Sequence, residues 1–205
     1  LYRKFPIVFA VSPAIRDILL DNGVDADRIQ VVTNGIPLPQ NNLNDLRKDE
    51  IAANFGIDAD DVCIVNAGRL THQKSQSTIV DAARILRSQG KRYKFIIAGD
   101  GELRPALEQQ IHDEMLQDQV HLIGFTDRIT ELLSLATAFV LPSRDEGMPI
   151  SLLEAVACRV PVVATDVGAV KSLIKHNTSG LLVRPGRPAE LATALEQVVE
   201  DLPRS

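Results

Sequence analysis

The sequence has no tryptophan, few other aromatic residues, and neither long apolar runs nor clusters of one charge sign. Aromatic residues make up 4% of its 205 residues, and the net charge is −5. No apolar run approaches the roughly 20 residues of a membrane-spanning helix, so we expect the chain not to cross a bilayer. The basic residues are scattered, which argues against non-specific binding to nucleic acid.

Cysteine is also scarce. Cys63 and Cys158 both lie in apolar segments, and no Cys-x-x-Cys pair is present. We expect both thiols to be small core residues in a reducing cytosol. The four histidines are separated from one another, so the sequence offers no metal site, and we expect neither a metal nor another cofactor.

The chain starts with Leu1-Tyr-Arg-Lys-Phe-Pro, which has neither an initiator methionine nor the apolar core of a signal peptide. We therefore expect it to be a piece of a longer protein, located in the cytoplasm or at the inner face of the membrane.

Hydrophobic residues make up 45% of the sequence, and many stand in short β-branched runs. Several runs, such as Phe95-Ile-Ile-Ala, are continuously apolar, which is typical of strands covered on both faces. The expected strands are residues 7–11, 29–33, 62–67, 94–98, 120–123, 138–141, 161–164 and 180–183.

Segments with apolar residues three and four positions apart alternate with these strands. The clearest are residues 78–86, 103–115 and 191–199. Strand–helix alternation of this kind predicts an α/β fold with a doubly wound, Rossmann-like parallel sheet. Ligands of such folds bind at the carboxyl ends of the strands, where the strand order reverses.

A segment rich in proline and asparagine, residues 37–45, follows the turn pair Asn34-Gly35. We interpret it as a boundary. Residues 1–34 are expected to form a strand–helix–strand unit, with Ser12 as the helix cap and Pro13 in the first turn. Residues 35–205 are expected to form a complete domain.

The segment Pro142-Ser-Arg-Asp-Glu-Gly-Met-Pro-Ile-Ser-Leu-Leu-Glu-Ala155 follows an expected strand. Pro149 suits the first position of a helix, because its missing N–H would have no partner there. The free amides of Ile150, Ser151 and Leu152, together with the helix dipole, predict an anion site suited to a diphosphate. Gly147 lets the backbone approach a ligand closely.

Two glutamates belong to the same segment. Glu146 lies in the loop and Glu154 about one turn into the helix. Both can face one crevice, where carboxylates accept hydrogen bonds from ribose or hexose hydroxyls. Two glutamates alone are better explained as surface charges, and it is the surrounding strand end, glycine and proline that favour a binding site.

A second candidate segment, Gly68-Arg-Leu-Thr-His-Gln-Lys74, follows the strand at residues 62–67. Arg69 and Lys74 stand at the same sheet edge, and Ser75 is expected to cap the next helix. Two cations there can neutralise a leaving diphosphate. An ordinary pair of solvated cations is the alternative.

Two further loops follow expected strands. Gly124-Phe125-Thr126 offers backbone groups and an aromatic face to a nucleobase, although Phe125 as a local core residue explains the sequence equally well. Gly99 and Gly101 begin a dinucleotide fingerprint, but Arg104 stands where its third glycine belongs, so a tight turn is the better explanation.

Taken together, these segments resemble the C-terminal domain of the GT-B-fold, family 4 retaining glycosyltransferases. The resemblance extends over nearly the whole chain. The matching motifs are residues 11–12, 31–35, 68–70 with Lys74, 98–101, 122–125, 141–143, the Glu146–Glu154 pair, 161–164 and 180–183. The segment Glu-Gly-Met-Pro-Ile-Ser-Leu-Leu-Glu is most similar to the corresponding segment of bacterial enzymes of surface polysaccharide or lipopolysaccharide synthesis.

The resemblance implies a role for each candidate residue. Arg69 and Lys74 would hold the diphosphate of a nucleotide-sugar donor and stabilise the leaving group, beside Gly68. Glu146 would contact donor-sugar hydroxyls, and Glu154 the ribose. The backbone from Gly147 through Met148, Pro149 and Ile150 to Ser151 would bind sugar and phosphate, with Gly124, Phe125 and Thr126 near the base. The sugar would be transferred to a glycan or lipid-linked acceptor with retention of its anomeric configuration.

Four positions depart from the family pattern. Arg159, Ala169 and Ser75 replace common glycines, and Pro37 replaces a common aspartate. The resemblance also implies an N-terminal domain that supplies the acceptor site, of which residues 1–34 would be the last unit. We therefore expect this fragment to bind a nucleoside diphosphate weakly and to transfer no sugar.

Two alternatives remain at this stage. A GT-B epimerase or phosphorylase fits Arg69, Lys74, Glu146 and Glu154 less well. A non-catalytic scaffold with the same fold is the other alternative, although the retention of all four charged residues counts against it.

Overall fold

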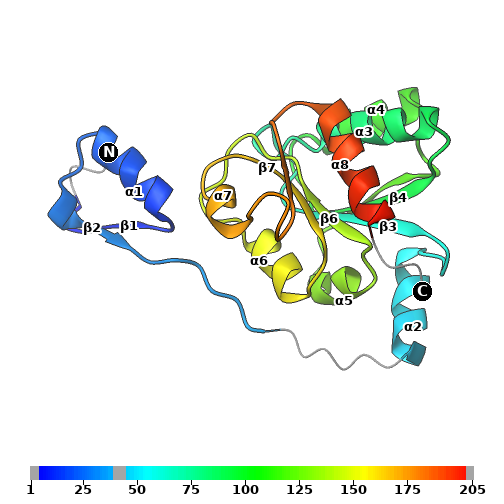
Figure 1. Cartoon of the computed structure of the whole chain (residues 1–205), viewed down its shortest axis with the longest axis horizontal. Coiled ribbons are helices and arrows are strands. Elements are labelled where there is room, and N and C mark those ends of the chain that lie inside the picture. Colours follow the sequence, from blue (N-terminus) through cyan, green and yellow to red (C-terminus); the bar gives the residue numbers. More distant parts are fainter. Residues whose placement is uncertain (1–4, 39–44, 202–205) are drawn as a thin grey trace.

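The computed structural model of the chain describes residues 5–38 and 45–201, with only the backbone of residues 45–47. It contains a small strand–helix–strand unit and a larger unit built on a central sheet (Figure 1). Most of the predicted boundary segment, residues 39–44, lies outside the described residues.

All eight predicted strands are present. They are β1 (Val8–Ala10), β2 (Ile29–Val31), β3 (Val62–Ala67), β4 (Tyr93–Ala98), β5 (Val120–Gly124), β6 (Ala138–Leu141), β7 (Val162–Thr165) and β8 (Leu181–Val183). The helices are α1 (Pro13–Asp21), α2 (Asp45–Phe55), α3 (Ser77–Ser88), α4 (Arg104–Asp113), α5 (Ile129–Ser134), α6 (Ile150–Ala157), α7 (Val170–Leu173) and α8 (Pro188–Glu200), with a 3-10 turn at Ala26–Arg28.

Three helices, α2, α5 and α7, have no counterpart among the predicted ones. The last two are only 6 and 4 residues long, too short to show a helical repeat. Helix α2 is rich in charged residues, so its apolar stripe is weak. In the part of the chain that the structure describes, no helix combines the length and apolar character needed to cross a bilayer.

The larger sheet has the strand order β5-β4-β3-β6-β7-β8, and every neighbouring pair is parallel. The order reverses between β3 and β6, as in a doubly wound sheet. The predicted fold class is therefore confirmed, and the loops after β3 and β6 meet at the switch point. The small unit pairs β1 with β2, also in parallel.

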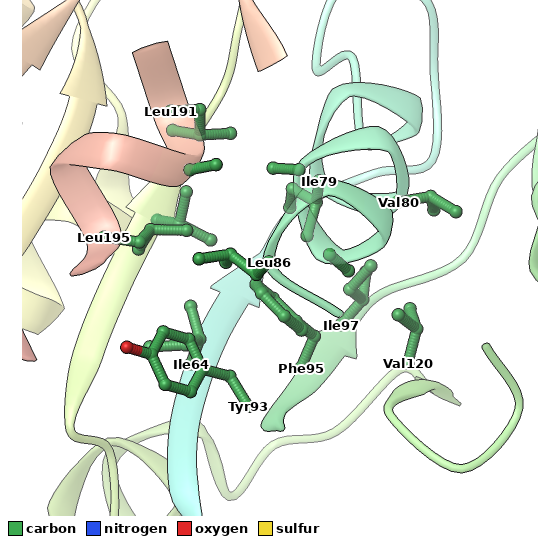
Figure 2. Close-up of a cluster of buried hydrophobic side chains, with 14 of the residues drawn as sticks. Ile64, Ile79, Val80, Leu86, Tyr93, Phe95, Ile97, Val120, Leu191 and Leu195 are labelled. Atoms are coloured by element: carbon green, nitrogen blue, oxygen red, sulfur yellow. The ribbon is translucent and has the colours of Figure 1, made fainter. Parts of the chain in front are cut away.

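The continuous apolar runs are explained by a core on each face of the sheet. In β3, Ile64 packs on one face, while Cys63 and Val65 pack on the other. Figure 2 shows the first face, where Leu86 of α3 and Leu195 of α8 cover β3 and β4. Helices α5, α6 and α7 contribute to the opposite core. Alternate residues thus face two apolar layers, which removes the polar alternation of a half-exposed strand.

The start of α1 was predicted correctly. Ser12 caps the helix through a 3.2 Å hydrogen bond from the Ile15 N–H to its side-chain oxygen, and Pro13 occupies the first turn. Ser12 is fully buried, so this cap also satisfies a hydroxyl that water cannot reach.

The end of α6 explains one departure from the family pattern. Arg159 has φ +59°, and the Val160 N–H bonds to the Ala155 carbonyl, as in a helix that ends in a left-handed residue. A side chain in this conformation costs about 1 kcal/mol relative to glycine. We expect Arg159→Gly to raise the free energy of unfolding by about 1 kcal/mol in urea denaturation. Lys171→Gly, within helix α7, is the control and should lower it; a loss at position 159 would contradict the strain argument.

Candidate functional site

A cleft of about 720 Å³ opens at the switch point, within the size range of small-molecule sites. Its lining comes from the ends of β3 and β4, from the loops after β3, β4, β5 and β6, from the start of α5, from the first two turns of α6, and from the segment after β2. The lining residues are Asn34, Ala67, Gly68, Arg69, Lys74, Ala98, Gly99, Asp100, Phe125, Thr126, Asp127, Ile129, Glu146, Met148, Pro149, Ile150, Ser151 and Glu154. The cleft thus brings together all the predicted site residues except Gly124 and Gly147.

Lys74 and Glu146 form an ion pair across the switch point. The Lys74 Nζ lies 2.6 Å from the Glu146 Oε1, which also accepts a 2.6 Å hydrogen bond from the Ser143 hydroxyl. Glu146 is 4% exposed and Ser143 is fully buried. A buried carboxylate needs such partners, because desolvation of an unpaired charge is costly. The pair therefore fixes the position of Glu146 in the cleft.

Further contacts join the loops after β3 and β6. The Arg144 N–H donates to the Gln73 carbonyl at 2.8 Å, and the Gln73 side-chain amide donates to the Asp145 carbonyl at 3.0 Å. Ser75 does not cap α3 as predicted, since Gln76 is the N-cap. Instead Ser75 has φ +54°, and its hydroxyl contacts the Thr78 hydroxyl at 3.1 Å. The loop turns back at Ser75 to reach the β6 loop, which explains why a glycine is common there.

The loop after β7 supports Glu146 from its backbone side. The Ala169 N–H donates to the Glu146 carbonyl at 3.1 Å, and Gly168, with φ +48°, packs directly against that carbonyl. The hydroxyl of Thr165 donates to the Ser143 carbonyl at 2.6 Å. The loops after three neighbouring strands therefore hold Glu146, those after β3 and β6 at its carboxylate and the one after β7 at its backbone.

Helix α6 begins one residue later than predicted. Pro149 is its N-cap, in an extended conformation, and the first helical residue is Ile150. The Leu153 N–H bonds to the Pro149 carbonyl, so the amides of Ile150, Ser151 and Leu152 precede the first intrahelical bond. Ile150 and Ser151 line the same cleft as Glu146.

Glu154 faces the same cleft from the second turn of α6. Burial raises its pKa above the ordinary value of 4.5. The protonated form is favoured because the carboxylate loses water without gaining an opposite charge. A hydroxyl-rich ligand would supply hydrogen bonds that the ionised group lacks.

Arg69 is exposed at the cleft, and its backbone is held firmly. The buried Gln76 side chain donates to the Arg69 carbonyl at 3.0 Å, and the next residue, Leu70, is fully buried. The backbone of Arg69 is thus held in place, and its side chain, with the guanidinium at its end, lines the cleft.

The loop after β5 resolves an alternative that the sequence left open. Phe125 is 84% exposed and lines the cleft beside Thr126, so it is not a core residue. Gly124 is not part of the lining. It has φ +75°, and its carbonyl accepts a 2.7 Å hydrogen bond from Gly99.

The glycines after β4 serve close packing, as expected from the incomplete fingerprint. A Cβ on Gly99 would lie 2.0 Å from the Gly68 carbonyl oxygen, and one on Gly101 would lie 2.5 Å from the Leu70 carbonyl oxygen. These contacts press the β4 loop against the β3 loop that carries Arg69. Gly147 has a similar packing role, because Val11 and Ile15 of the small unit lie 3.2 Å and 3.5 Å from a Cβ built on it.

Seven lining residues were not singled out as site residues from the sequence, namely Asn34, Ala67, Ala98, Gly99, Asp100, Asp127 and Ile129. Asn34 stands in an Asn-Gly pair, which indicates a turn, so nothing in the sequence assigned it to the site. Asp100 and Asp127 each follow a strand, and that position is the signal that could have identified them.

A larger groove, about 870 Å³, runs along β8 and α8. Its most prominent charges, Arg184 and Glu190, are paired with each other. Among residues 5–38 and 45–201, no group of three or more potential metal ligands is present. Cys63 is buried, with its pKa raised to about 12 by desolvation, whereas Cys158 is only half-buried and so is not the core thiol that was predicted.

Comparisons with known proteins find glycosyltransferases among the relatives of this chain. Alpha-D-kanosaminyltransferase of Streptomyces kanamyceticus is 38% identical over 157 residues, covering 76% of this chain and 40% of the relative. The amylovoran biosynthesis glycosyltransferase AmsK of Erwinia amylovora is 32% identical over 203 residues, covering 95% of this chain and 48% of the relative. The chain therefore spans about half the length of these relatives or less.

The crystal structure of Anabaena Alr3699/HepE in complex with UDP-glucose has a similar fold, with a TM-score of 0.89 and 26% identity. The match covers 98% of this chain and 56% of that one. The profile of the family described as glycosyl transferases group 1 matches residues 47–204, which include nearly the whole cleft. This chain belongs to the glycosyl transferases group 1 family.

Proposed function

We propose that this chain is the donor-binding part of a retaining glycosyltransferase that uses a nucleoside-diphosphate sugar. The observation that carries the proposal is the convergence of Arg69, Lys74, Glu146 and Glu154 on one cleft at the switch point. Two cations and two carboxylates there match the two parts of a nucleotide sugar, an anionic diphosphate and hydroxyl-rich sugars.

The cations serve the diphosphate. Lys74 has three N–H donors, of which Glu146 takes one, so the others remain for a phosphate oxygen. Arg69 adds a second positive charge from the same loop, and Ile150 and Ser151, whose amides precede the first intrahelical bond of α6, also line the cleft. These groups stabilise the negative charge that develops on a departing diphosphate.

The carboxylates serve the sugars. Glu146 is fixed by Ser143 and Lys74, so it can hold the hydroxyls of the transferred sugar in one orientation. Glu154 lies on α6, while Glu146 lies in the loop before that helix, and Glu154 would accept hydrogen bonds from the ribose. Phe125 and Ile150, both exposed at the cleft, offer apolar surface to the base.

The proposal includes a division of the chain into residues 1–34, the last unit of an N-terminal domain, and residues 35–205, the donor domain. Support comes from the separate small sheet of β1 and β2 and from the share of its relatives that the chain covers. The acceptor, a glycan or a lipid-linked sugar, would bind to the rest of the protein. The proposal extends to a role in bacterial surface polysaccharide synthesis at the cytoplasmic face of the membrane. One relative of this chain is named for amylovoran biosynthesis.

Calorimetric titration of the chain with UDP and with GDP tests the proposal. We expect one of them to bind, and we expect Glu154→Gln to weaken that binding about fivefold to tenfold, since one charged hydrogen bond is lost. Glu50→Gln, an exposed substitution on α2, is the matched control and should change nothing. Binding of neither nucleotide would refute the proposal, and binding indifferent to Glu154→Gln would favour a non-catalytic scaffold.

The raised pKa of Glu154 gives this variant a second signature. The folded chain holds the Glu154 proton more tightly than the unfolded chain, so stability falls as pH rises from 4.5 through the folded-state pKa. Glu154→Gln should therefore raise the thermal unfolding midpoint at neutral pH but not below pH 4.5. A destabilised variant at pH 7 would contradict this sign.

A further inference from the structure

Asn34 is the one cleft residue that comes from outside the matched family region, residues 47–204. It follows β2, on the segment that leaves the small unit. Its side-chain Nδ2 donates a 3.0 Å hydrogen bond to the Met148 carbonyl, 114 residues away. Met148 lies in the loop between Glu146 and the start of α6, residues 146–149, which we call the donor loop, so this bond reaches the centre of that loop.

The small unit contacts the same loop at a second point. Gly147 packs against Val11 and Ile15, at distances that leave no room for a side chain at this position without a shift of its neighbours. Together, the Asn34 bond and the Gly147 contact hold two successive residues of the donor loop from the small unit. The position of the loop therefore depends on both units.

The amide of Asn34 has hydrogen-bonding capacity left for a ligand. An asparagine side chain has two N–H donors and an acceptor oxygen, and the bond to Met148 uses one donor. The strand order β5-β4-β3-β6 places the β5 loop, with Phe125, at one end of the cleft and the β6 loop at the other. Asn34 is bonded to the β6 loop and therefore lies at the Glu146 end, away from the aromatic side chain.

We propose that Asn34 is a donor-contacting specificity residue that binds a hydroxyl of the transferred sugar while it holds the donor loop through Met148. The inference rests on the proposed function, because it assigns Asn34 to the sugar end of a nucleotide-sugar site. The group it recognises is a sugar hydroxyl, to which the amide can both donate and accept. The donor site is thus composite, with its sugar end completed by a residue of the small unit.

The test compares a nucleotide sugar with its bare nucleoside diphosphate. The wild-type chain is titrated by calorimetry with UDP, UDP-glucose, GDP and GDP-mannose, and the pair that binds is used for the variants. We expect Asn34→Ala to weaken binding of the nucleotide sugar about tenfold and that of the bare diphosphate no more than threefold. Asn22→Ala is the matched control, because Asn22 also donates to a backbone carbonyl in the small unit but lies outside the cleft.

Asn34→Asp tests the contact with the loop separately. A carboxylate keeps the shape of the amide but cannot donate to the Met148 carbonyl and repels it, so we expect the bare diphosphate also to bind about tenfold more weakly. The affinities for the nucleotide sugar and for the bare diphosphate are measured on the same variant. Their ratio therefore stays informative if that variant is less stable.

Each outcome has one meaning. If Asn34→Ala lowers the affinity for the nucleotide sugar and for the bare diphosphate equally, or lowers neither, the sugar contact is overturned while the proposed function stands. Unchanged diphosphate binding in Asn34→Asp would overturn the contact with the loop. Failure of the wild-type chain to bind any of the four compounds would instead refute the proposed function itself.

Discussion

Replacement of Lys74 with methionine is expected to lower the free energy of unfolding by about 3 kcal/mol and to abolish measurable binding of the nucleoside diphosphate. Glu146 is 4% exposed, and Lys74 is its only oppositely charged partner among the described residues. Removal of one member of a buried pair leaves an uncompensated charge, which costs more than the pair contributes. Urea denaturation and calorimetric titration measure the two effects.

A second substitution separates the unpaired charge from the loss of packing. In the double variant Lys74→Met/Glu146→Gln no charge is left unpaired, so we expect most of the lost stability, about 2 kcal/mol, to return. Binding should not return, because the cation is still missing. If the double variant were as unstable as the sum of the single variants, the ion pair would not be what places Lys74 and Glu146 together.

Lys94→Met is the control for binding. Lys94 also pairs with a carboxylate, Asp61, at 2.6 Å, but near the amino ends of β3 and β4, at the opposite edge of the sheet. We expect this variant to lose stability and to bind the nucleoside diphosphate with unchanged affinity. Weaker binding in this variant would mean that the effect of Lys74→Met reports stability and not contact with the ligand.

The second large effect is expected from Gly168→Ala. A Cβ at this position would lie 1.9 Å from the Glu146 carbonyl oxygen, far inside contact distance, and the residue has φ +48°. Either the β7 loop or the Glu146 backbone must move. We expect a loss of at least 3 kcal/mol in the free energy of unfolding and at least a tenfold loss of affinity, because Glu146 and the start of α6 belong to one short segment.

Gly186→Ala is the control that separates collision from backbone strain. Gly186 has a similar φ of +67°, and nothing lies within 4 Å of a Cβ built on it. This variant should cost only about 1 kcal/mol, the penalty for a side chain in the left-handed region, and should leave binding unchanged. Equal losses in the two variants would show that the Gly168 contact with Glu146 has no special role.

Much of the site was predictable because its parts are local. Pro149 and Gly147 indicated a turn into a helix, and the apolar runs at β3 and β6 indicated buried parallel strands. Parallel strands end at one edge of a sheet, so Arg69 and Glu146 were expected near each other. The exact start of α6 and the helix cap at Ser75 were each wrong by one residue. At Ser75 the turn geometry depends on contacts with the neighbouring β6 loop.

The sequence by itself determined the eight strands and helices α1, α3, α4, α6 and α8, since hydrophobic periodicity and turn residues act over a few positions. Which loops become neighbours was decided only by the tertiary structure, through the order β5-β4-β3-β6-β7-β8. That order lets Lys74 reach Glu146, and the β7 loop that follows β6 in the sheet brings Gly168 beneath Glu146. The contact of Asn34 with Met148 depends on packing between two separate sheets, and no local pattern encodes it.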